Sequence, residues 1–307
     1  MTIMAVYTYL YKKDIQEITR VFNLGKLIKY NGIKEGIENT NYFIQTNKKK
    51  VILTIFEKRV RVSDVPYFVK YMLALNKEKI KCPLPLKNKK NNFIFKVKGK
   101  SSIIVSFLNG KAKNNINFKD CKIIGNELAK LHKASKKIKY RRKNSLGYKE
   151  WLKIYKKTKN PNKNEIYNYF DTYKKNIPKN LPMGLIHGDI FPDNIFYYKN
   201  KFNGFIDFYF SFYGSYVYEI AIAVNSMCFT KGYFDEKKYN FFIKGYQSIR
   251  NLSKLELNSL PIMCLGASIR FYVTRLYDLK FTPKNAKVKR KDPNEYLYKM
   301  RYFYTKL

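Results

Sequence analysis

The chain has 307 residues and a mass of 36.7 kDa, long enough for two lobes that each bury a core. Its formal net charge of +40 comes mostly from lysines scattered along the chain, so we interpret the charge as a solvated coat and expect no specific nucleic-acid binding. No apolar run approaches the roughly 20 residues of a membrane span, and the N-terminus shows no secretory signal. The four cysteines form no C-x-x-C pair, which predicts free thiols in the cytoplasm.

The first third of the chain has the pattern of a small lobe of strands with two helices. Apolar residues at helical spacing predict one helix from residue 5 to about residue 30, closing near Gly25, and another over 64–76. Runs of β-branched and aromatic residues predict five strands: two within 32–44, separated by a small-residue turn, and three over 50–56, 93–97 and 102–107. We therefore predict an antiparallel-sheet lobe over 1–107, with a short hinge over 108–110.

Residues 108–307 are predicted to form a mostly helical lobe, which makes the fold α+β and bilobal. The Tyr- and Lys-rich span up to about residue 175 receives no element, the stretch 183–208 is predicted to be a hairpin, and the polar spans 156–164 and 283–291 are predicted to be loops. His132, inside a helical run, is expected to be a packed histidine rather than a ligand. The predicted helices are 118–133, 216–229, 236–249, 254–279 and 293–304.

Polar residues at fixed offsets beside two strand-like runs are the most informative feature of the chain. Asp189 is followed by Asn194 five residues on and by Asp207 thirteen residues further, and His187 comes two residues before Asp189. This is the H-x-D-x-x-x-x-N and D-F spacing of kinase catalytic and metal loops. Asp189 is then the base that accepts a hydroxyl proton, Asn194 and Asp207 are oxygen ligands for Mg²⁺, and His187 braces the loop. The alternative is a capping turn rich in Asp and Asn.

With these elements placed, the chain resembles the aminoglycoside phosphotransferase/choline kinase branch of the protein-kinase-like superfamily. The branch signature is His187-Gly-Asp followed by Asn194, and further blocks over nearly the whole chain are similar to homoserine kinases of that branch. Among these blocks are Gly36-Ile-Glu-Asn-Thr-Asn-Tyr-Phe, Cys82-Pro-Leu-Pro and Arg270-Phe-Tyr-Val-Thr-Arg-Leu-Tyr-Asp.

The resemblance implies the reaction as well as the fold. The γ-phosphate of ATP, with Mg²⁺, would pass to the side-chain hydroxyl of L-homoserine, in a cleft between the two lobes. The product would be O-phosphohomoserine, a precursor of threonine. The alternative is another small-molecule kinase of the branch, with an amino alcohol, an aminoglycoside or a sugar as acceptor. The oligomeric state stays open.

The resemblance also implies where ATP binds. The turn 35–41 lies where this fold covers the triphosphate, so the backbone at Gly36 and the side chains of Thr40 and Asn41 are expected to hold phosphate oxygens. Adenine is expected to contact backbone groups of the hinge around Ser106 and Leu108. An ordinary hairpin turn is the alternative for 35–41.

One departure from the kinase pattern concerns the lysine of the third strand, which usually pairs with the α- and β-phosphates. Thr54 occupies that register here. Lys58 lies on the same strand face and is the expected replacement, against the alternative of a solvated charge at the end of the strand.

The acceptor carries a carboxylate and an ammonium group, and a bidentate arginine is the usual partner of a planar carboxylate. Arg270, Arg275 and Asp278 fall within one helical run and are the expected substrate contacts, together with Tyr209 after the metal-loop Asp207. An intrahelical ion pair between Arg275 and Asp278 is the alternative for the last two, and core packing is the alternative for Tyr209.

Overall fold

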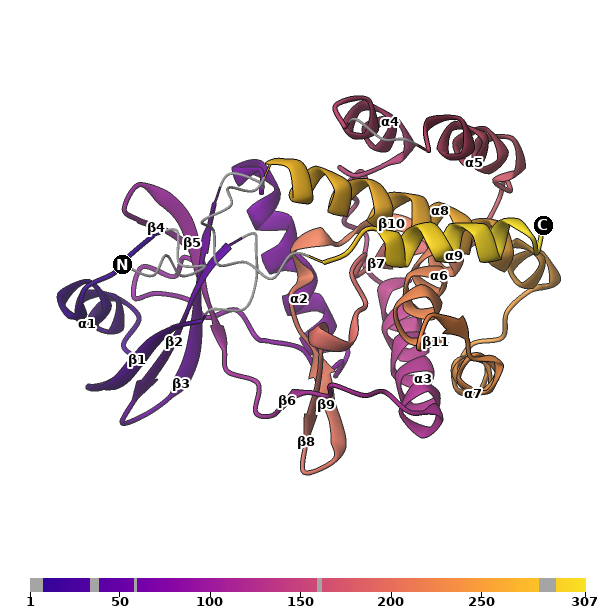
Figure 1. Cartoon of the computed structure of the whole chain (residues 1–307). Helices are drawn as coiled ribbons and strands as arrows, with labels where there is room; N and C mark the ends of the chain where they lie inside the picture. The colour runs from indigo at the N-terminus through magenta and orange to yellow at the C-terminus, as the bar shows by residue number, and fades with distance from the viewer. Residues whose placement is uncertain (1–7, 34–38, 58–59, 159–161, 282–290) are drawn as a thin grey trace. The chain divides into compact units, whose positions relative to one another are not determined.

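The chain divides into a unit built on a five-stranded sheet and a unit built mainly from helices (Figure 1). The computed structural model describes residues 8–33, 39–57, 60–158, 162–281 and 291–307. The first unit holds the described residues up to Asn109, and the second holds those from Gly110 onward. An antiparallel sheet followed by many helices is the fold class that the sequence predicts.

The sheet of the first unit is antiparallel throughout, in the order β1-β2-β3-β5-β4. Alternation of side chains along β2 and β3 places one set of apolar residues on the face that packs against the N-terminal helix α1. The five strands are β1 (Leu27–Ile33), β2 (Asn39–Thr46), β3 (Lys50–Phe56), β4 (Ile94–Val97) and β5 (Lys100–Ser106).

The first helix is shorter than predicted. α1 spans Lys12–Val21, whereas the sequence pattern predicted a helix from residue 5 to about residue 30, closing near Gly25. Asn23 and Gly25 both have positive φ, at 50° and 98°, and this left-handed backbone ends the helix. Leu27 then begins β1. The second helix, α2 (Val65–Lys77), follows a short 3-10 turn over Val62–Asp64 and agrees with its prediction.

Seven helices of the second unit are described, and five of them confirm predicted ones. The other two, α4 and α5, lie in the Tyr- and Lys-rich span to which the sequence assigned no element. α6 is buried on nearly every side and packs along α8. The helices are α3 (Phe118–Ser135), α4 (Tyr148–Lys156), α5 (Lys163–Asn176), α6 (Tyr216–Met227), α7 (Glu236–Gln247), α8 (Lys254–Phe281) and α9 (Asn294–Tyr304).

The predicted hairpin over 183–208 is only partly right. The hairpin itself is β8 (Ile195–Tyr198) with β9 (Lys201–Phe205), extended by β6 (Lys111–Ala112). The first strand of the stretch, β7 (Met183–Ile186), instead pairs with β10 (Phe212–Ser215), which the sequence did not predict. A further short pair joins β11 (Phe229–Thr230) to β12 (Tyr233–Phe234), and 3-10 turns lie at Pro192–Asn194 and Phe208–Phe210.

Two predicted properties of the whole chain can be compared with the structure. Across the part of the chain that the structure describes, no helix combines the length and the apolar character needed to cross a membrane. All four cysteines are free, as the sequence predicted, and all four are buried.

Helices α3 and α7 touch through their backbones, because each presents a glycine to the other. A Cβ on Gly125 of α3 would collide with the carbonyl oxygen of Phe242, and a Cβ on Gly245 of α7 would collide with that of Lys122. A side chain at either position therefore pushes the two helices apart.

We predict that Gly245→Ala lowers the free energy of unfolding by roughly 1–3 kcal/mol, because overpacking displaces a backbone that has no flexible atom to yield. Urea denaturation measures the loss. Gly147→Ala is the matched control, since the nearest atom to its Cβ would be 3.8 Å away. Equal losses in the two variants would contradict the close approach of the helices.

His132 connects three helices in the core of the second unit. Its Nδ1 lies 2.7 Å from the Tyr246 hydroxyl of α7, and its Nε2 lies 2.8 Å from the Glu219 carboxylate of α6. The ring is fully buried, and this burial lowers its pKa from the ordinary value of a histidine. The other histidine of the chain, His187, is also buried, and its pKa is lowered for the same reason.

We predict that the free energy of unfolding decreases as the pH falls below about 6.5. In this range the histidines of the unfolded chain bind protons, whereas the buried histidines of the folded chain stay neutral. Each histidine contributes up to about 1.4 kcal/mol per pH unit inside that window and nothing above it. Urea midpoints at pH 7.5, 6.5 and 5.5 measure the slope. His132→Gln should reduce the slope and leave the share of His187; an unchanged slope would contradict the assignment.

Candidate active site

Asp189 lies in the loop that leaves β7, and Asn194 at the far end of the same loop holds it. The amide nitrogen of Asn194 donates to the backbone carbonyl of Asp189 at 2.9 Å and to its carboxylate Oδ2 at 3.0 Å. The 3-10 turn over Pro192–Asn194 brings the two residues together. Asn194 is buried and Asp189 is half-buried, so the carboxylate is oriented without being sealed from solvent.

The β8–β9 hairpin brings Asp207 next to Asn194. Its ladder pairs Ile195 with Phe205, and the N–H of Ile206 donates to the Asn194 carbonyl at 3.0 Å. Asp207 is therefore one residue beyond the position opposite Asn194. It has φ 64° and ψ 62°, a left-handed conformation that is uncommon outside glycine and concentrates at functional sites.

His187 connects the loop that carries Asp189 with the segment that carries Asp207. Its Nε2 lies 2.7 Å from the Ile206 carbonyl, and its Nδ1 accepts the N–H of Asp189 at 3.2 Å. A carbonyl only accepts, so Nε2 carries the proton and the ring is neutral. Burial, which lowers the pKa of His187, favours the same form. The geometry fits the bracing role that the sequence suggested.

Behind the loop, Glu219 of α6 accepts the N–H of Gly188 at 2.6 Å. Its other carboxylate oxygen accepts Nε2–H of His132, and the chain of hydrogen bonds continues through Tyr246 to Arg250. Glu219 and His132 are both fully buried. The sequence reasoning missed Glu219, although a single acidic residue inside an otherwise apolar helix is a usable signal for a buried partner.

The structure gives Arg270 an internal partner. It is 3% exposed, and its Nη1 donates to the carbonyl of Gly188 at 2.6 Å. Arg275, five residues on in α8, donates to the Asp292 carbonyl at 2.8 Å and to Glu295 Oε2 at 2.6 Å. Both guanidinium groups are thus buried and have partners within the chain, which argues against their predicted contact with a substrate carboxylate.

The other two predicted substrate contacts are more accessible. Tyr209 lies in the 3-10 turn Phe208–Phe210 directly after Asp207, and Asp278 lies in the last turns of α8. Both side chains are half-buried.

In the first unit, Thr40 and Asn41 point to opposite faces of β2. Thr40 is fully buried, and its hydroxyl donates to Glu57 Oε1 at 2.7 Å, while Lys100 pairs with the other oxygen of Glu57. These contacts argue against the predicted contact of Thr40 with phosphate. Asn41 is half-buried and accepts the Thr54 hydroxyl at 2.8 Å, so its amide nitrogen remains as a donor on the face that carries Thr54.

The hinge residues are anchored to their own unit. The N–H of Ser106 donates to the Leu84 carbonyl at 2.8 Å, and the Ser106 hydroxyl accepts the N–H of Leu84. Leu108 is half-buried. Gly36 and Lys58, predicted to contact the triphosphate, lie outside the described residues.

Arg142 is a second residue that the sequence reasoning did not single out. Its Nη1 donates to the carbonyl of Ser211 at 3.0 Å, just after the 3-10 turn that follows Asp207. The N–H of Tyr213 in turn donates to the Arg142 carbonyl at 2.9 Å. Arg142 therefore holds the end of the segment that begins with Asp207.

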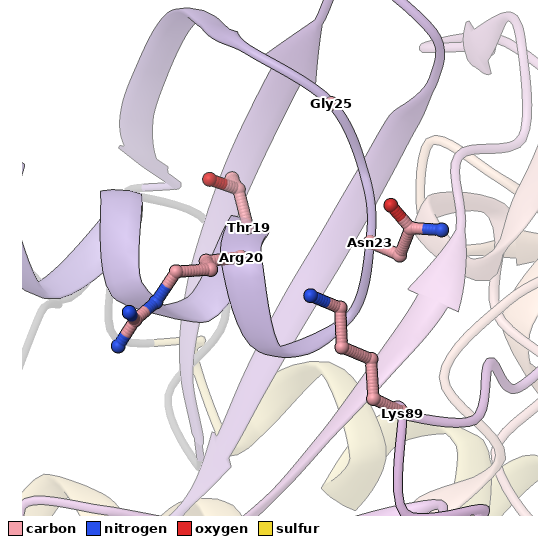
Figure 2. A pocket seen from close by; sticks show the side chains of 5 residues that line it. All are labelled: Thr19, Arg20, Asn23, Gly25 and Lys89. Atoms are coloured by element: carbon pink, nitrogen blue, oxygen red, sulfur yellow. The ribbon is translucent and has the colours of Figure 1, made fainter.

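A hollow of about 280 Å³ lies at the end of α1 in the first unit (Figure 2). Its lining contains no residue of the predicted site, and its Arg20 is paired with Glu17 at 2.6 Å. It is lined by Thr19, Arg20, Asn23, Gly25 and Lys89.

Comparison with known proteins places the chain in one family. Residues 29–250 match the phosphotransferase enzyme family. The homoserine kinase of Rhizobium etli is 37% identical, over 97% of this chain and 96% of that protein. The homoserine kinase of Agrobacterium fabrum is 37% identical, over 98% and 96%.

Solved structures agree on the fold. An amicoumacin kinase in complex with AMP-PNP, Ca²⁺ and Ami has a TM-score of 0.75 at 15% identity, over 97% of this chain and 93% of that one. A choline kinase from Streptococcus pneumoniae has a TM-score of 0.69 at 13% identity, over 96% and 97%. The chain therefore belongs to the phosphotransferase enzyme family and, within it, to the family of these homoserine kinases.

Proposed function

We propose that this protein transfers the γ-phosphate of ATP to the side-chain hydroxyl of L-homoserine and releases O-phospho-L-homoserine for threonine biosynthesis. The observation that carries the proposal is the near full-length likeness, at 37% identity, to proteins named homoserine kinase. The arrangement of Asp189, Asn194 and Asp207 supports it, because these three groups are what phosphoryl transfer to a hydroxyl requires. Four free, buried thiols support a reducing cytoplasm as the site of action.

In this proposal Asp189 accepts the proton of the acceptor hydroxyl as the new P–O bond forms and the bond between the γ-phosphorus and the bridging oxygen of ADP breaks, so that ADP leaves. Asn194 holds Oδ2 of the carboxylate at 3.0 Å and so directs the other oxygen toward the acceptor. A half-buried carboxylate with one oxygen fixed acts mainly by positioning, which is the main source of acceleration in phosphoryl transfer.

The donor set around Asp189 fits Mg²⁺. Asn194 uses its amide nitrogen to hold Asp189, so its amide oxygen is left to face a metal, and Asp207 supplies a carboxylate nearby. Amide and carboxylate oxygens are the hard ligands that Mg²⁺ prefers. When bound, the ion would neutralise charge that develops on the phosphate oxygens.

For ATP, the candidate contacts are the amide nitrogen of Asn41 and the backbone around Ser106 and Leu108. For the acceptor, Tyr209 and Asp278 are the candidates, with Asp278 suited to the ammonium group of an amino acid. Asn41 would bind ATP through its amide nitrogen, because its amide oxygen already accepts the Thr54 hydroxyl.

We expect L-homoserine to support ATP consumption in a coupled kinase assay, and choline, ethanolamine and kanamycin to support far less. A site that pairs with the polar groups of an amino acid rejects acceptors that lack one of those groups, because its own polar groups would then stay unpaired. ³¹P NMR of the product should show a phosphate monoester. Turnover of choline or kanamycin without turnover of homoserine would show that the protein is a different small-molecule kinase of the same family.

We expect Asp189→Asn to lower kcat by a factor of about 10²–10⁴, the usual contribution of a general base, with little change in the Kd for ATP. Asp193→Asn is the matched control in the same loop, because the Asp193 side chain is 62% exposed and its ion pair with Lys291, at 3.1 Å, lies on the surface. Steady-state kinetics and nucleotide titration measure the two effects. Near-normal kcat in Asp189→Asn would remove Asp189 from the role of base.

A further inference from the structure

Gly188, the residue before Asp189, is held at both of its backbone polar groups by buried charges of opposite sign. Its N–H donates to Glu219 at 2.6 Å, and its carbonyl accepts Nη1–H of Arg270 at 2.6 Å. The two side chains come from different helices, α6 and α8, and both are almost fully buried. The position favours glycine strongly, because φ is +80° and a Cβ would lie 2.8 Å from the Phe210 carbonyl oxygen.

The bond from Arg270 acts on the peptide group that joins Gly188 to Asp189. Arg270 holds the carbonyl edge of this group, and His187 accepts from its N–H edge at 3.2 Å. A peptide group is planar, so two fixed points on opposite edges set its rotation. That rotation determines where the side chain of Asp189 points.

The surroundings of Arg270 do not explain it as a stabilising residue. No carboxylate among the described residues lies within ion-pair distance of it, and its buried Nε has no hydrogen-bond partner there. Its guanidinium lies over the rings of Phe271 at 4.6 Å and Phe210 at 5.9 Å. A buried guanidinium group without a carboxylate partner is less favourable for stability than a well-packed apolar side chain.

The same contacts connect Arg270 to both loops of the site. The Gly188 carbonyl belongs to the loop of Asp189, and Phe210 ends the 3-10 turn that follows Asp207. One guanidinium therefore touches the backbone of the first loop and a ring of the second.

We propose that Arg270 is a positioning residue for phosphoryl transfer, which sets the orientation of Asp189 through the Gly188 carbonyl, and that it is not a ligand of the acceptor carboxylate. The inference rests on the proposed function, in which Asp189 accepts the proton of the acceptor hydroxyl. It replaces the carboxylate contact that the sequence suggested for this arginine.

The kinetic test compares Arg270→Ala and Arg270→Lys with the unaltered chain on two acceptors. The acceptors are L-homoserine and 3-aminopropan-1-ol, which is homoserine without its carboxylate. We expect Arg270→Ala to lower kcat on the order of 100-fold for both acceptors, the scale of a small misplacement at the reacting centre, with little change in either KM. Arg270→Lys keeps the positive charge and a hydrogen-bond donor, so its kcat should lie between that of Arg270→Ala and that of the unaltered chain.

Two further measurements separate positioning from general damage. Millimolar guanidinium should restore part of kcat in Arg270→Ala, since it can occupy the vacated space and donate to the same carbonyl, and it should not raise kcat of the unaltered chain. Hydrogen exchange followed by mass spectrometry should show faster exchange in the peptides that cover 183–198 of Arg270→Ala. The sheet of the first unit should exchange at its original rate.

Several outcomes would overturn the inference. A rise in KM for homoserine that is absent with 3-aminopropan-1-ol would make Arg270 a carboxylate ligand. Faster exchange throughout the second unit without rescue by guanidinium would make it a purely structural residue. If the unaltered chain does not phosphorylate homoserine, the proposed function fails. The exchange measurement would then decide the inference by itself, because unchanged rates over 183–198 would reject it. If Arg270→Ala does not fold, Arg270→Lys carries the same comparison.

Discussion

The buried carboxylate of Glu219 is the contact on which the candidate site depends. One oxygen accepts the backbone N–H of Gly188, and the other accepts the Nε2–H of the His132 ring; the Glu219 side chain is fully buried. Removing one donor leaves a buried carboxylate oxygen without its hydrogen bond, which is destabilising. The backbone of the loop that presents Asp189 is therefore fixed by a core helix, α6, and this helix packs along α8. The packing of the helical core of the second unit therefore also determines the orientation of the candidate base, Asp189.

Much of the fold could be predicted because periodic apolar patterns are local. The helices α3, α6, α7, α8 and α9 and the strands β2, β3, β4 and β5 follow from such patterns, whereas most of β1 lies before the stretch in which the first strand was predicted. The errors occur where pairing or backbone dihedrals decide. The four residues of β10 carry no distinctive alternation, so the partner of β7 was not visible. The end of α1 depends on left-handed backbone at Asn23, a position that composition alone does not mark.

The same distinction applies to the site. Asp189, Asn194 and Asp207 could be predicted because a loop and one hairpin bring them together within a short stretch of chain. The backbone partner of Arg270 could not be predicted, because it is a carbonyl 82 positions away and nothing in the spacing indicates it. An arginine can bind a substrate carboxylate or donate to a backbone carbonyl. The residue type is the same in both cases, so only the observed contact distinguishes the two roles.

His187 shows why a neutral imidazole belongs between the two loops. One nitrogen must donate to the Ile206 carbonyl and the other must accept from the N–H of Asp189, so the ring needs one proton and one lone pair. Lysine or arginine has no acceptor, and a protonated imidazole has none either. Burial lowers the pKa of His187 and thereby keeps the lone pair in place. The left-handed backbone at Asp207, which costs on the order of 1–3 kcal/mol in a non-glycine residue, is held one residue beyond the carbonyl that this ring binds. The burial that makes His187 sensitive to pH is thus the same condition that lets one side chain hold both loops.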